Sequence, residues 1–296
     1  MKLKKLIALL VAVACVITLA ACGKNKGSEQ ESLPEKPEDV FDIMESIAEE
    51  NSDADVSSYV MAAESDLTWE EVEGGVSITG YTGADTAIEL PAQISGQNVV
   101  AIGSNAFSNT SVAGVKLPDT VETIKYHAFY YLGTLVEVKM GSGVKTIGEG
   151  AFQGCASLSN VELNVGLEIL GEDCFSTCTS LAEISIPGSV TSIGAGSFCM
   201  TALESVRIPG SVQVVGKQAF TNCMSLKEVV IEDGVQELCD RVFERCKALT
   251  RAELPASIQT FGYYPFDYAD NVTIYAPAGS AAVSFAEEYG IPVKNN

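Results

Sequence analysis

Residues 181–223 read LAEISIPGSVTSIGAGSFCMTALESVRIPGSVQVVGKQAFTNC, and this stretch contains one sequence unit twice. The two copies place apolar residues, a proline, a glycine and a phenylalanine in the same order: Leu181, Ile184, Ile186, Pro187, Val190, Ile193, Gly194 and Phe198, then Leu203, Val206, Ile208, Pro209, Val212, Val215, Gly216 and Phe220. A fixed period of this length predicts one supersecondary unit that is repeated and stacked. The chain is therefore expected to form a solenoid, in which each coil contacts mainly its neighbours.

The phenylalanine of the unit recurs along most of the chain, at steps of 22 or 23 residues: Phe107, Phe129, Phe152, Phe175, Phe198, Phe220, Phe243 and Phe266. An apolar residue precedes each by five positions: Ile102, Ile124, Ile147, Leu170, Ile193, Val215, Leu238 and Phe261. We therefore predict about eight coils of 22–23 residues, with both columns facing a shared core.

Within each coil, a Val-x-Ile step such as Val206-x-Ile208 alternates with period two, which is typical of a half-buried strand. Stacked in register, these strands predict a parallel sheet. The proline after several of them ends the hydrogen-bonding ladder, because it has no amide hydrogen to donate. The Ala-Phe segment that follows predicts one short helical turn.

The whole pattern, Leu-x-x-Ile-x-Ile-Pro-x-x-Val-x-x-Ile-Gly-x-x-x-Phe-x-x-Cys, resembles the BspA-type leucine-rich repeat of bacterial surface proteins. The resemblance covers residues 67–296 and implies a leucine-rich repeat solenoid: stacked short parallel β-strands with turns and short helical segments. We expect caps at both ends. A hairpin turning at Gly74 and Gly75 would form the first, and a short helix over residues 280–289 the second.

The first 21 residues have the features of a secretory signal: a basic start, an apolar run and small residues. Their last positions, followed by Cys22, resemble a bacterial lipobox, which implies cleavage before Cys22 and lipidation of its thiol. An uncleaved membrane anchor is the alternative, although the apolar run is short against the roughly 20 residues of a spanning helix. The chain is thus expected to be extracytoplasmic, lipid-anchored at the cell membrane or surface, and to meet the membrane only through this lipid.

Residues 22–66 differ in composition, with many acids and few aromatics. This composition predicts an acidic, largely disordered tether. Apolar residues at helical spacing allow one short helix within it, at Val40, Phe41, Met44, Ile47 and Ala48. The formal net charge of the whole chain is −21, which argues against nucleic-acid binding because no basic footprint is present.

Four cysteines share the column three residues after the phenylalanine: Cys155, Cys178, Cys223 and Cys246. The same column accepts threonine, leucine and alanine, which favours a small buried site filled by free thiols. Disulfides between neighbours, Cys155 with Cys178 or Cys223 with Cys246, stay open as an alternative.

The sequence shows no catalytic constellation. His127 is the one histidine, so paired-histidine metal sites are impossible, and its column of mixed residues predicts an exposed position. No nucleophile elbow or phosphate-binding loop is present. We therefore expect no enzyme activity, no cofactor and no metal.

Two columns of outward strand positions form the candidate binding face: Lys116, Lys139, Glu162 and Arg207 in one, and Glu137, Glu183, Glu228 and Arg251 in the other. A second candidate is the aromatic patch of Tyr263, Tyr264 and Tyr268, which lies beside Phe261 and Phe266. This cluster could instead pack beneath the last coil.

The resemblance implies protein-protein interaction or adhesion, with host, matrix or other cell-surface proteins as partners. Two other hypotheses remain: a structural or display module of the envelope, and a lipoprotein that captures glycans or nutrients.

Overall fold

The computed structural model describes residues 46–47 and 54–296. The chain divides into one unit that ends at Ser46 and a second from Ile47 to Asn296, and the fold below is that of the second. The signal segment 1–21, Cys22 and most of the tether lie outside the described residues. Of the possible tether helix only Ser46 and Ile47 are described, and both are helical.

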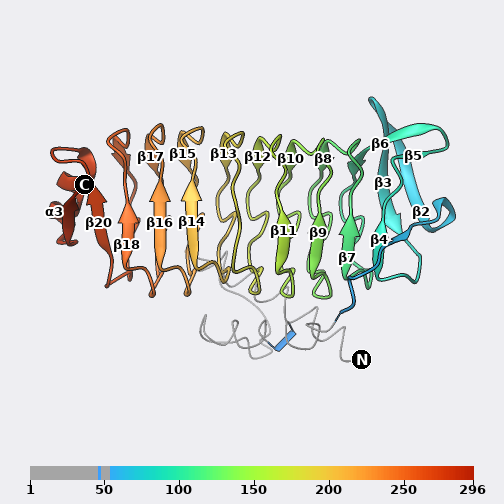
Figure 1. Cartoon of the computed structure of the whole chain (residues 1–296), viewed down its shortest axis with the longest axis horizontal. Helices are drawn as coiled ribbons and strands as arrows, with labels where there is room; N and C mark the ends of the chain where they lie inside the picture. The colour runs from blue at the N-terminus through green and yellow to red at the C-terminus, as the bar shows by residue number, and fades with distance from the viewer. Residues whose placement is uncertain (1–45, 48–53) are drawn as a thin grey trace, which may run out of the picture. The chain divides into compact units, whose positions relative to one another are not determined.

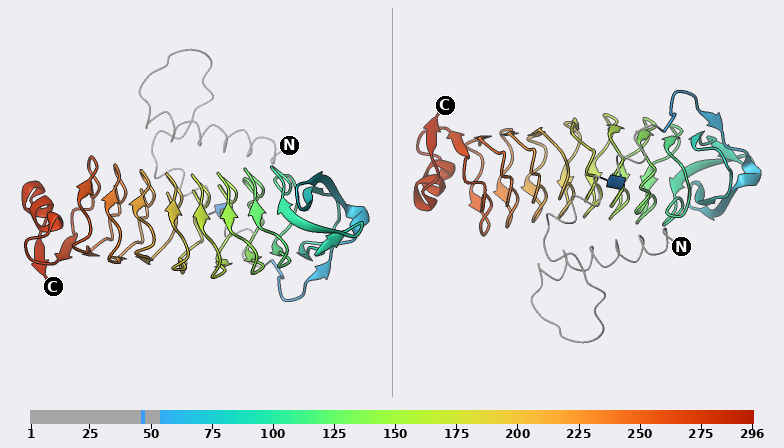
Figure 2. Two further views of the ribbon diagram at one scale, coloured as in Figure 1. Left: turned by 90° about the horizontal axis from the view of Figure 1, so that it is seen from above. Right: turned by 90° about the horizontal axis from the view of Figure 1, so that it is seen from below.

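The second unit is a solenoid whose coils stack along its long axis (Figures 1 and 2). The strands of the Val-x-Ile step form two separate parallel ladders. The N-terminal ladder runs in the order β1 (Val60–Met61), β4 (Ala87–Glu89), β7 (Gly114–Lys116), β9 (Glu137–Lys139) and β11 (Asn160–Glu162). The C-terminal ladder consists of β14 (Ser205–Ile208), β16 (Glu228–Ile231), β18 (Arg251–Glu253), β20 (Thr273–Ala276) and β21 (Val293–Asn295).

A longer sheet lies on another side of the coils and runs through both halves without interruption. It contains β2 (Leu67–Val72), β3 (Gly75–Tyr81), β5 (Gln93–Ile94), β6 (Gln97–Ile102), β8 (Thr123–Ile124), β10 (Thr146–Ile147), β12 (Ile169–Leu170), β13 (Ser192–Ile193), β15 (Val214–Val215), β17 (Glu237–Leu238) and β19 (Thr260–Phe261). Its register pairs Ile102 with Ile124, Ile124 with Ile147, and so on to Phe261. This confirms the predicted apolar column five residues before the phenylalanines.

The two ladders are separated by the coil that carries Ile184 and Ile186. Residues 181–187 form no strand, although Ile186 is buried and Ile184 packs against the core. This coil, which has one of the clearest repeat sequences, thus keeps the side-chain pattern without the backbone ladder.

The phenylalanines form a continuous stack through the solenoid. Successive rings from Phe107 to Phe266 lie 4.9–5.6 Å apart, with planes inclined by 21° or less. The seven rings from Phe107 to Phe243 are fully buried, and Phe266 is 5% exposed. Offset stacking of this kind stabilises aromatic pairs beyond the burial of their area.

The segments around the phenylalanines are pairs of turns rather than the predicted short helical turns. Residues two before and two after the phenylalanine adopt left-handed backbone angles in most coils, as His127 (φ 54°) and Tyr131 (φ 49°) do around Phe129. The Phe129 amide donates to the Ala151 carbonyl of the next coil at 2.8 Å, and the coils from Phe107 to Phe243 repeat this bond. Because these amides bond between coils, they are not available for helical bonds within one.

The two ends have the predicted elements. Strands β2 and β3 form an antiparallel hairpin in which Val72 pairs with Gly75. At the other end, α3 (Ala281–Tyr289) begins after Ser280, whose hydroxyl accepts a bond from the Val283 amide, and ends at left-handed Gly290.

The solenoid unit includes residues that precede the predicted boundary at residue 67. Strand β1 pairs in parallel with β4, and a short 3-10 helix, η1 (Glu64–Asp66), leads into β2. Residues 54–66 therefore belong to the solenoid unit, because their backbone extends the N-terminal ladder by one strand.

Candidate interaction surface

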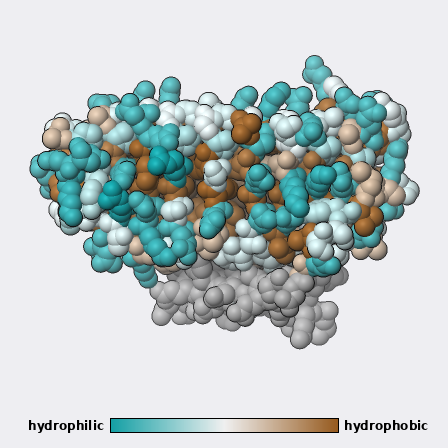
Figure 3. Space-filling view, in the orientation of Figure 1, coloured by the Kyte–Doolittle hydropathy of each residue, from teal (hydrophilic) through white to brown (hydrophobic). Residues whose placement is uncertain are grey.

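The predicted binding residues lie on the outer side of the two ladders, here called the ladder face. The register places Lys116, Lys139 and Glu162 in one row, and Ser205, Glu228 and Arg251 in another. Hydrophilic side chains spread over the solenoid, with hydrophobic residues between them (Figure 3). Most of the predicted residues are at least partly exposed, and Glu137 is the exception at 7%.

The basic residues of the ladder face are paired with acids of the same chain. Four ammonium or guanidinium groups lie 3.0–3.1 Å from a carboxylate oxygen: Lys116 with Glu89, Lys139 with Glu137, Arg207 with Glu232, and Arg251 with Glu228. Arg251 also bonds Glu253 and stands 3.9 Å from the Tyr275 ring centre. By contrast, Glu162 and Glu183 are exposed and form no ion pair within the part of the chain that the structure describes; Lys139, the register neighbour of Glu162, is paired with Glu137 instead.

A segment of the chain itself covers part of this face. Residues 54–61, here called the strap, enter the N-terminal ladder as β1, and the register places Tyr59 beside Ala87, Gly114 and Glu137. An added Cβ at Gly114 would stand 3.0 Å from the Tyr59 hydroxyl and 2.8 Å from a methyl of Val56. The small residues Ala87 and Gly114 of this row thus leave room for the Tyr59 side chain.

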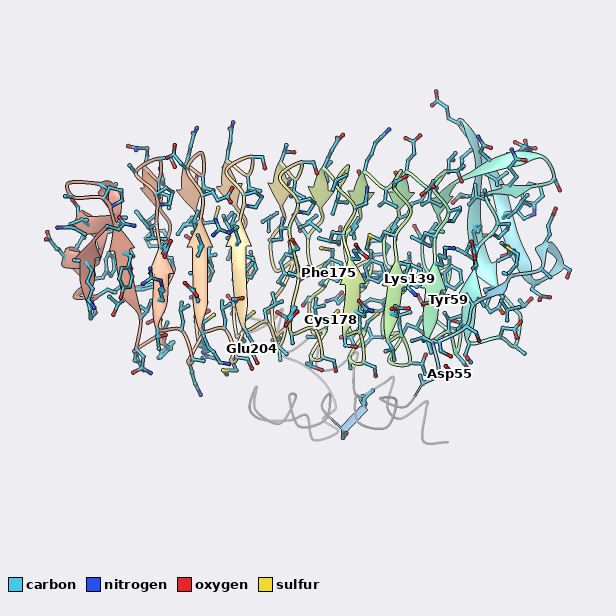
Figure 4. All side chains as sticks on the ribbon, viewed as in Figure 1. Asp55, Tyr59, Lys139, Phe175, Cys178 and Glu204 are labelled. Carbon is cyan, nitrogen blue, oxygen red and sulfur yellow. The ribbon has the colours of Figure 1, made fainter. Side chains whose placement is uncertain are left out.

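A polar cluster surrounds Glu137, at the hydroxyl end of the Tyr59 side chain. The Tyr59 hydroxyl donates to one carboxylate oxygen of Glu137, and the Asn160 amide donates to the other. The Lys139 ammonium lies 3.0 Å from Glu137 and 4.7 Å from the Tyr59 ring centre. Figure 4 shows Tyr59 and Lys139 together on this part of the ladder.

Electrostatics keep the Tyr59 hydroxyl protonated in this cluster. Partial burial raises the pKa of Tyr59, and its hydrogen bond to Glu137 and the charge of that carboxylate raise it further. The hydroxyl therefore serves as a hydrogen-bond donor throughout the physiological range.

The structure therefore corrects one predicted site residue. Glu137 is not a free surface charge, because the strap, Lys139 and Asn160 enclose it. Sequence reasoning missed the strap, although one signal was present: a glycine at the outward position 114 of a strand often marks the close approach of another chain segment.

The predicted aromatic patch divides into two parts. Phe261 and Phe266 pack against Phe285 of α3, at ring distances of 4.2 and 6.3 Å. Tyr263, Tyr264 and Tyr268 are instead 73%, 53% and 54% exposed. Packing at the last coil thus describes the phenylalanines, whereas the tyrosines are exposed and their role in binding stays a prediction.

The described cysteines are free thiols, and all except Cys239 are buried. In the predicted column each thiol donates to the backbone carbonyl of the phenylalanine in the preceding coil, for example Cys178 to Phe152 at 3.2 Å. Burial raises the pKa of Cys155 and Cys178 well above the ordinary thiol value. These thiols are packing groups that also satisfy carbonyl oxygens.

His127 is half-buried rather than exposed. Its ring is stacked between Tyr126 at 3.7 Å and Tyr130 at 3.9 Å, and burial lowers its pKa. Among residues 46–47 and 54–296, no group of three histidine, cysteine or acidic side chains could hold a metal ion. Over the same residues, no helix is long and apolar enough to cross a membrane.

Comparisons with known proteins give a consistent result. The sequence profile of the BspA type leucine rich repeat region matches residues 100–227 and 191–280, in six copies. The crystal structure of a leucine rich repeat protein from T. pallidum is similar to this chain, with 26% identity, a TM-score of 0.57, and coverage of 79% of this chain and 98% of that one. The pneumococcal vaccine antigen PcpA is 18% identical, with a TM-score of 0.53 and coverage of 75% and 70%. No curated protein matches the chain.

Proposed function

Because the chain belongs to the BspA-type leucine-rich repeat family, we propose that it is a lipid-anchored surface protein that binds a protein partner without catalysis. Leucine-rich repeat domains generally bind proteins, and proteins with repeats of this type are typically found at the bacterial surface. The partner would be a host, matrix or other cell-surface protein.

The observation that carries this proposal is the unpaired acidic part of the ladder face. The strap covers the row at Gly114 and Glu137, and the cations further along are neutralised by neighbouring carboxylates. Glu162 and Glu183 remain exposed and unpaired among the described residues, around the coil where the two ladders are interrupted. With a net charge of −21, the chain would attract a partner that presents a basic surface.

The lipid anchor rests on residues 1–22. Signal cleavage before Cys22 and acylation of its thiol would tether the solenoid outside the cytoplasmic membrane, and several acyl chains are needed for stable anchoring. Mass spectrometry of the protein purified from its native membrane tests this. An acylated N-terminal Cys22 is expected, and an unmodified Cys22 would contradict the anchor without affecting the binding proposal.

Binding is tested by biolayer interferometry of the chain from residue 22 onward against a panel of matrix and cell-surface proteins. We expect saturable micromolar or tighter binding to a basic partner, and weaker binding at higher salt because exposed charges are screened. Replacing both Glu162→Lys and Glu183→Lys should slow association.

A matched control is Glu287→Lys together with Glu288→Lys, which changes two exposed acids on α3 at the C-terminal end of the solenoid. Equal loss of binding in the control and the double variant would assign the effect to net charge alone and refute a local site. If no protein in the panel binds, a display role for the solenoid gains support.

A further inference from the structure

A cavity of about 280 Å³ lies at the C-terminal end of the solenoid, apart from the ladder face. One wall is the turn of the last phenylalanine coil, residues 264–272, and the other is the end of α3 with residues 289–292. Phe266 and Phe285, which are 5% and 8% exposed, contribute buried rings to its lining.

Three tyrosines line this cavity and keep about half of their surface in solvent. Tyr264, Tyr268 and Tyr289 are 53%, 54% and 51% exposed. Tyr289 packs against the buried Phe285 at a ring distance of 4.8 Å, whereas Phe266 continues the phenylalanine stack and reaches Phe285 without Tyr264 or Tyr268. Single exposed aromatics are ordinary, but a group of them around one cavity marks a binding site.

The polar lining restricts the charge of the ligand. Asp267 and Asp270 line the cavity, and its lining contains no lysine, arginine or histidine. Two carboxylates with no cation disfavour an anionic ligand. They suit a ligand that donates several hydrogen bonds, and the tyrosine hydroxyls can donate or accept.

We propose that this cavity binds a neutral hexose unit of a glycan. A pyranose ring has an apolar C–H face that can lie on a tyrosine ring, and a rim of hydroxyls that can donate to Asp267 and Asp270. The cavity volume of about 280 Å³ is just below the range of ligand pockets, roughly 300–1,000 Å³, so it fits one sugar ring rather than an extended chain.

An ammonium ligand is the main competitor, because cations also bind between aromatic rings and carboxylates. The Arg245 guanidinium already lies 5.4 Å from the Tyr268 ring centre, which places a cation of the chain itself next to the site. A second cation would have to compete with Arg245 for this ring, which favours the neutral sugar.

The test is saturation-transfer NMR of the chain from residue 22 onward with four probes, the trimers of N-acetylglucosamine, glucose, mannose and galactose, and with tetramethylammonium as a fifth. We expect saturable millimolar binding of at least one sugar. Tyr268→Asn and Tyr289→Ala should each weaken it at least tenfold. Asparagine is chosen at Tyr268 because it tolerates the left-handed backbone there (φ 57°).

The control is Tyr126→Ala, which removes an exposed tyrosine near the other end of the phenylalanine stack. It should leave sugar binding unchanged, and an unchanged urea midpoint shows that each variant is folded. Binding of tetramethylammonium alone, binding of no sugar, or equal loss in the Tyr126→Ala control would each overturn the proposal. None of these outcomes bears on the protein-binding proposal, which rests on Glu162 and Glu183.

Discussion

The strap should open more often when the hydrogen bond from Tyr59 to Glu137 is removed, while the solenoid beneath stays folded. The Tyr59→Phe substitution removes only the hydroxyl that donates to this carboxylate. A hydrogen bond to a charged group contributes about 1.5–3 kcal/mol. We expect a value around or just below the lower end of that range, about 1–2 kcal/mol, because the ring is partly exposed and because Lys139 and Asn160 still contact Glu137.

The Gly114→Ala substitution should open the strap further by a steric route. The added methyl would meet Val56 at 2.8 Å and the Tyr59 ring carbon that bears the hydroxyl at 3.3 Å. Because these are side-chain atoms of the strap, the strap can lift away without distortion of β7. The hydroxyl bond and the contact of Lys139 with the ring would then be lost together.

Native-state hydrogen exchange measures this opening directly. The Ala62 amide, which donates to the Glu89 carbonyl at 2.9 Å, reports on the strap, and the Phe198 amide reports on the distant core. About 1–2 kcal/mol corresponds to roughly 5–30-fold faster exchange at Ala62 in Tyr59→Phe. Exchange at Phe198 and the urea midpoint should hardly change, because local opening does not require global unfolding.

The matched control for the glycine is Gly188→Ala, where an added methyl meets no atom within 4 Å. It should leave exchange at Ala62 unchanged. If Tyr59→Phe and Gly114→Ala also leave that exchange unchanged, the contacts of Tyr59 do not hold the strap, and the ladder bonds of β1 alone must do so.

Three further outcomes follow from the core. Replacing Phe175→Ala should cost about 3–5 kcal/mol, because the ring is fully buried between two stacked neighbours, and urea unfolding should become less cooperative as the two halves separate. Burial and two nearby glutamates raise the pKa of Asp173 from 3.8 to about 6, so the folded state favours the protonated carboxyl. The stability that this preference contributes is fully present below pH 3.8 and is lost as pH rises through about 6. Asp173→Asn should therefore raise the urea midpoint at pH 7 and not at pH 3.5, and an equal rise at both would refute the shift. A thiol reagent should modify only Cys239 among the described cysteines of the folded chain, and all seven after unfolding; fewer than seven would reveal a disulfide.

The sequence predicts the coils well because their side chains repeat an inward pattern. The apolar column from Ile102 to Phe261 and the phenylalanine stack both follow from spacing alone, since each coil must bury the same positions. Backbone pairing is a separate matter. The coil with Ile184 satisfies the pattern and still forms no ladder strand, so apolar alternation predicts burial but not hydrogen bonding.

Two other features, the left-handed backbone positions and the strap, were not predicted from the sequence, for different reasons. The left-handed column contains Asn105, Gly150 and Asp173, which favour that backbone, but His127 and Arg241 in the same column concealed the signal. The strap could not be placed from the sequence because it belongs to no repeat. The row of the ladder that it contacts differed from the others only in its small outward residues, Ala87 and Gly114.

The variable columns of the solenoid do not all report on binding. Three ion pairs join residues exactly one coil apart, 23 positions in sequence, on exposed surface: Glu122 with Lys145, Glu204 with Lys227, and Glu228 with Arg251. Opposite charges on neighbouring strands attract, whereas a repeated charge would be repelled by its own copy in the next coil. Charge pairing of this kind therefore accounts for part of the variation in the outer columns without a ligand. The residues that inform on function are those left without such a partner, and on the ladder face these include Glu162 and Glu183.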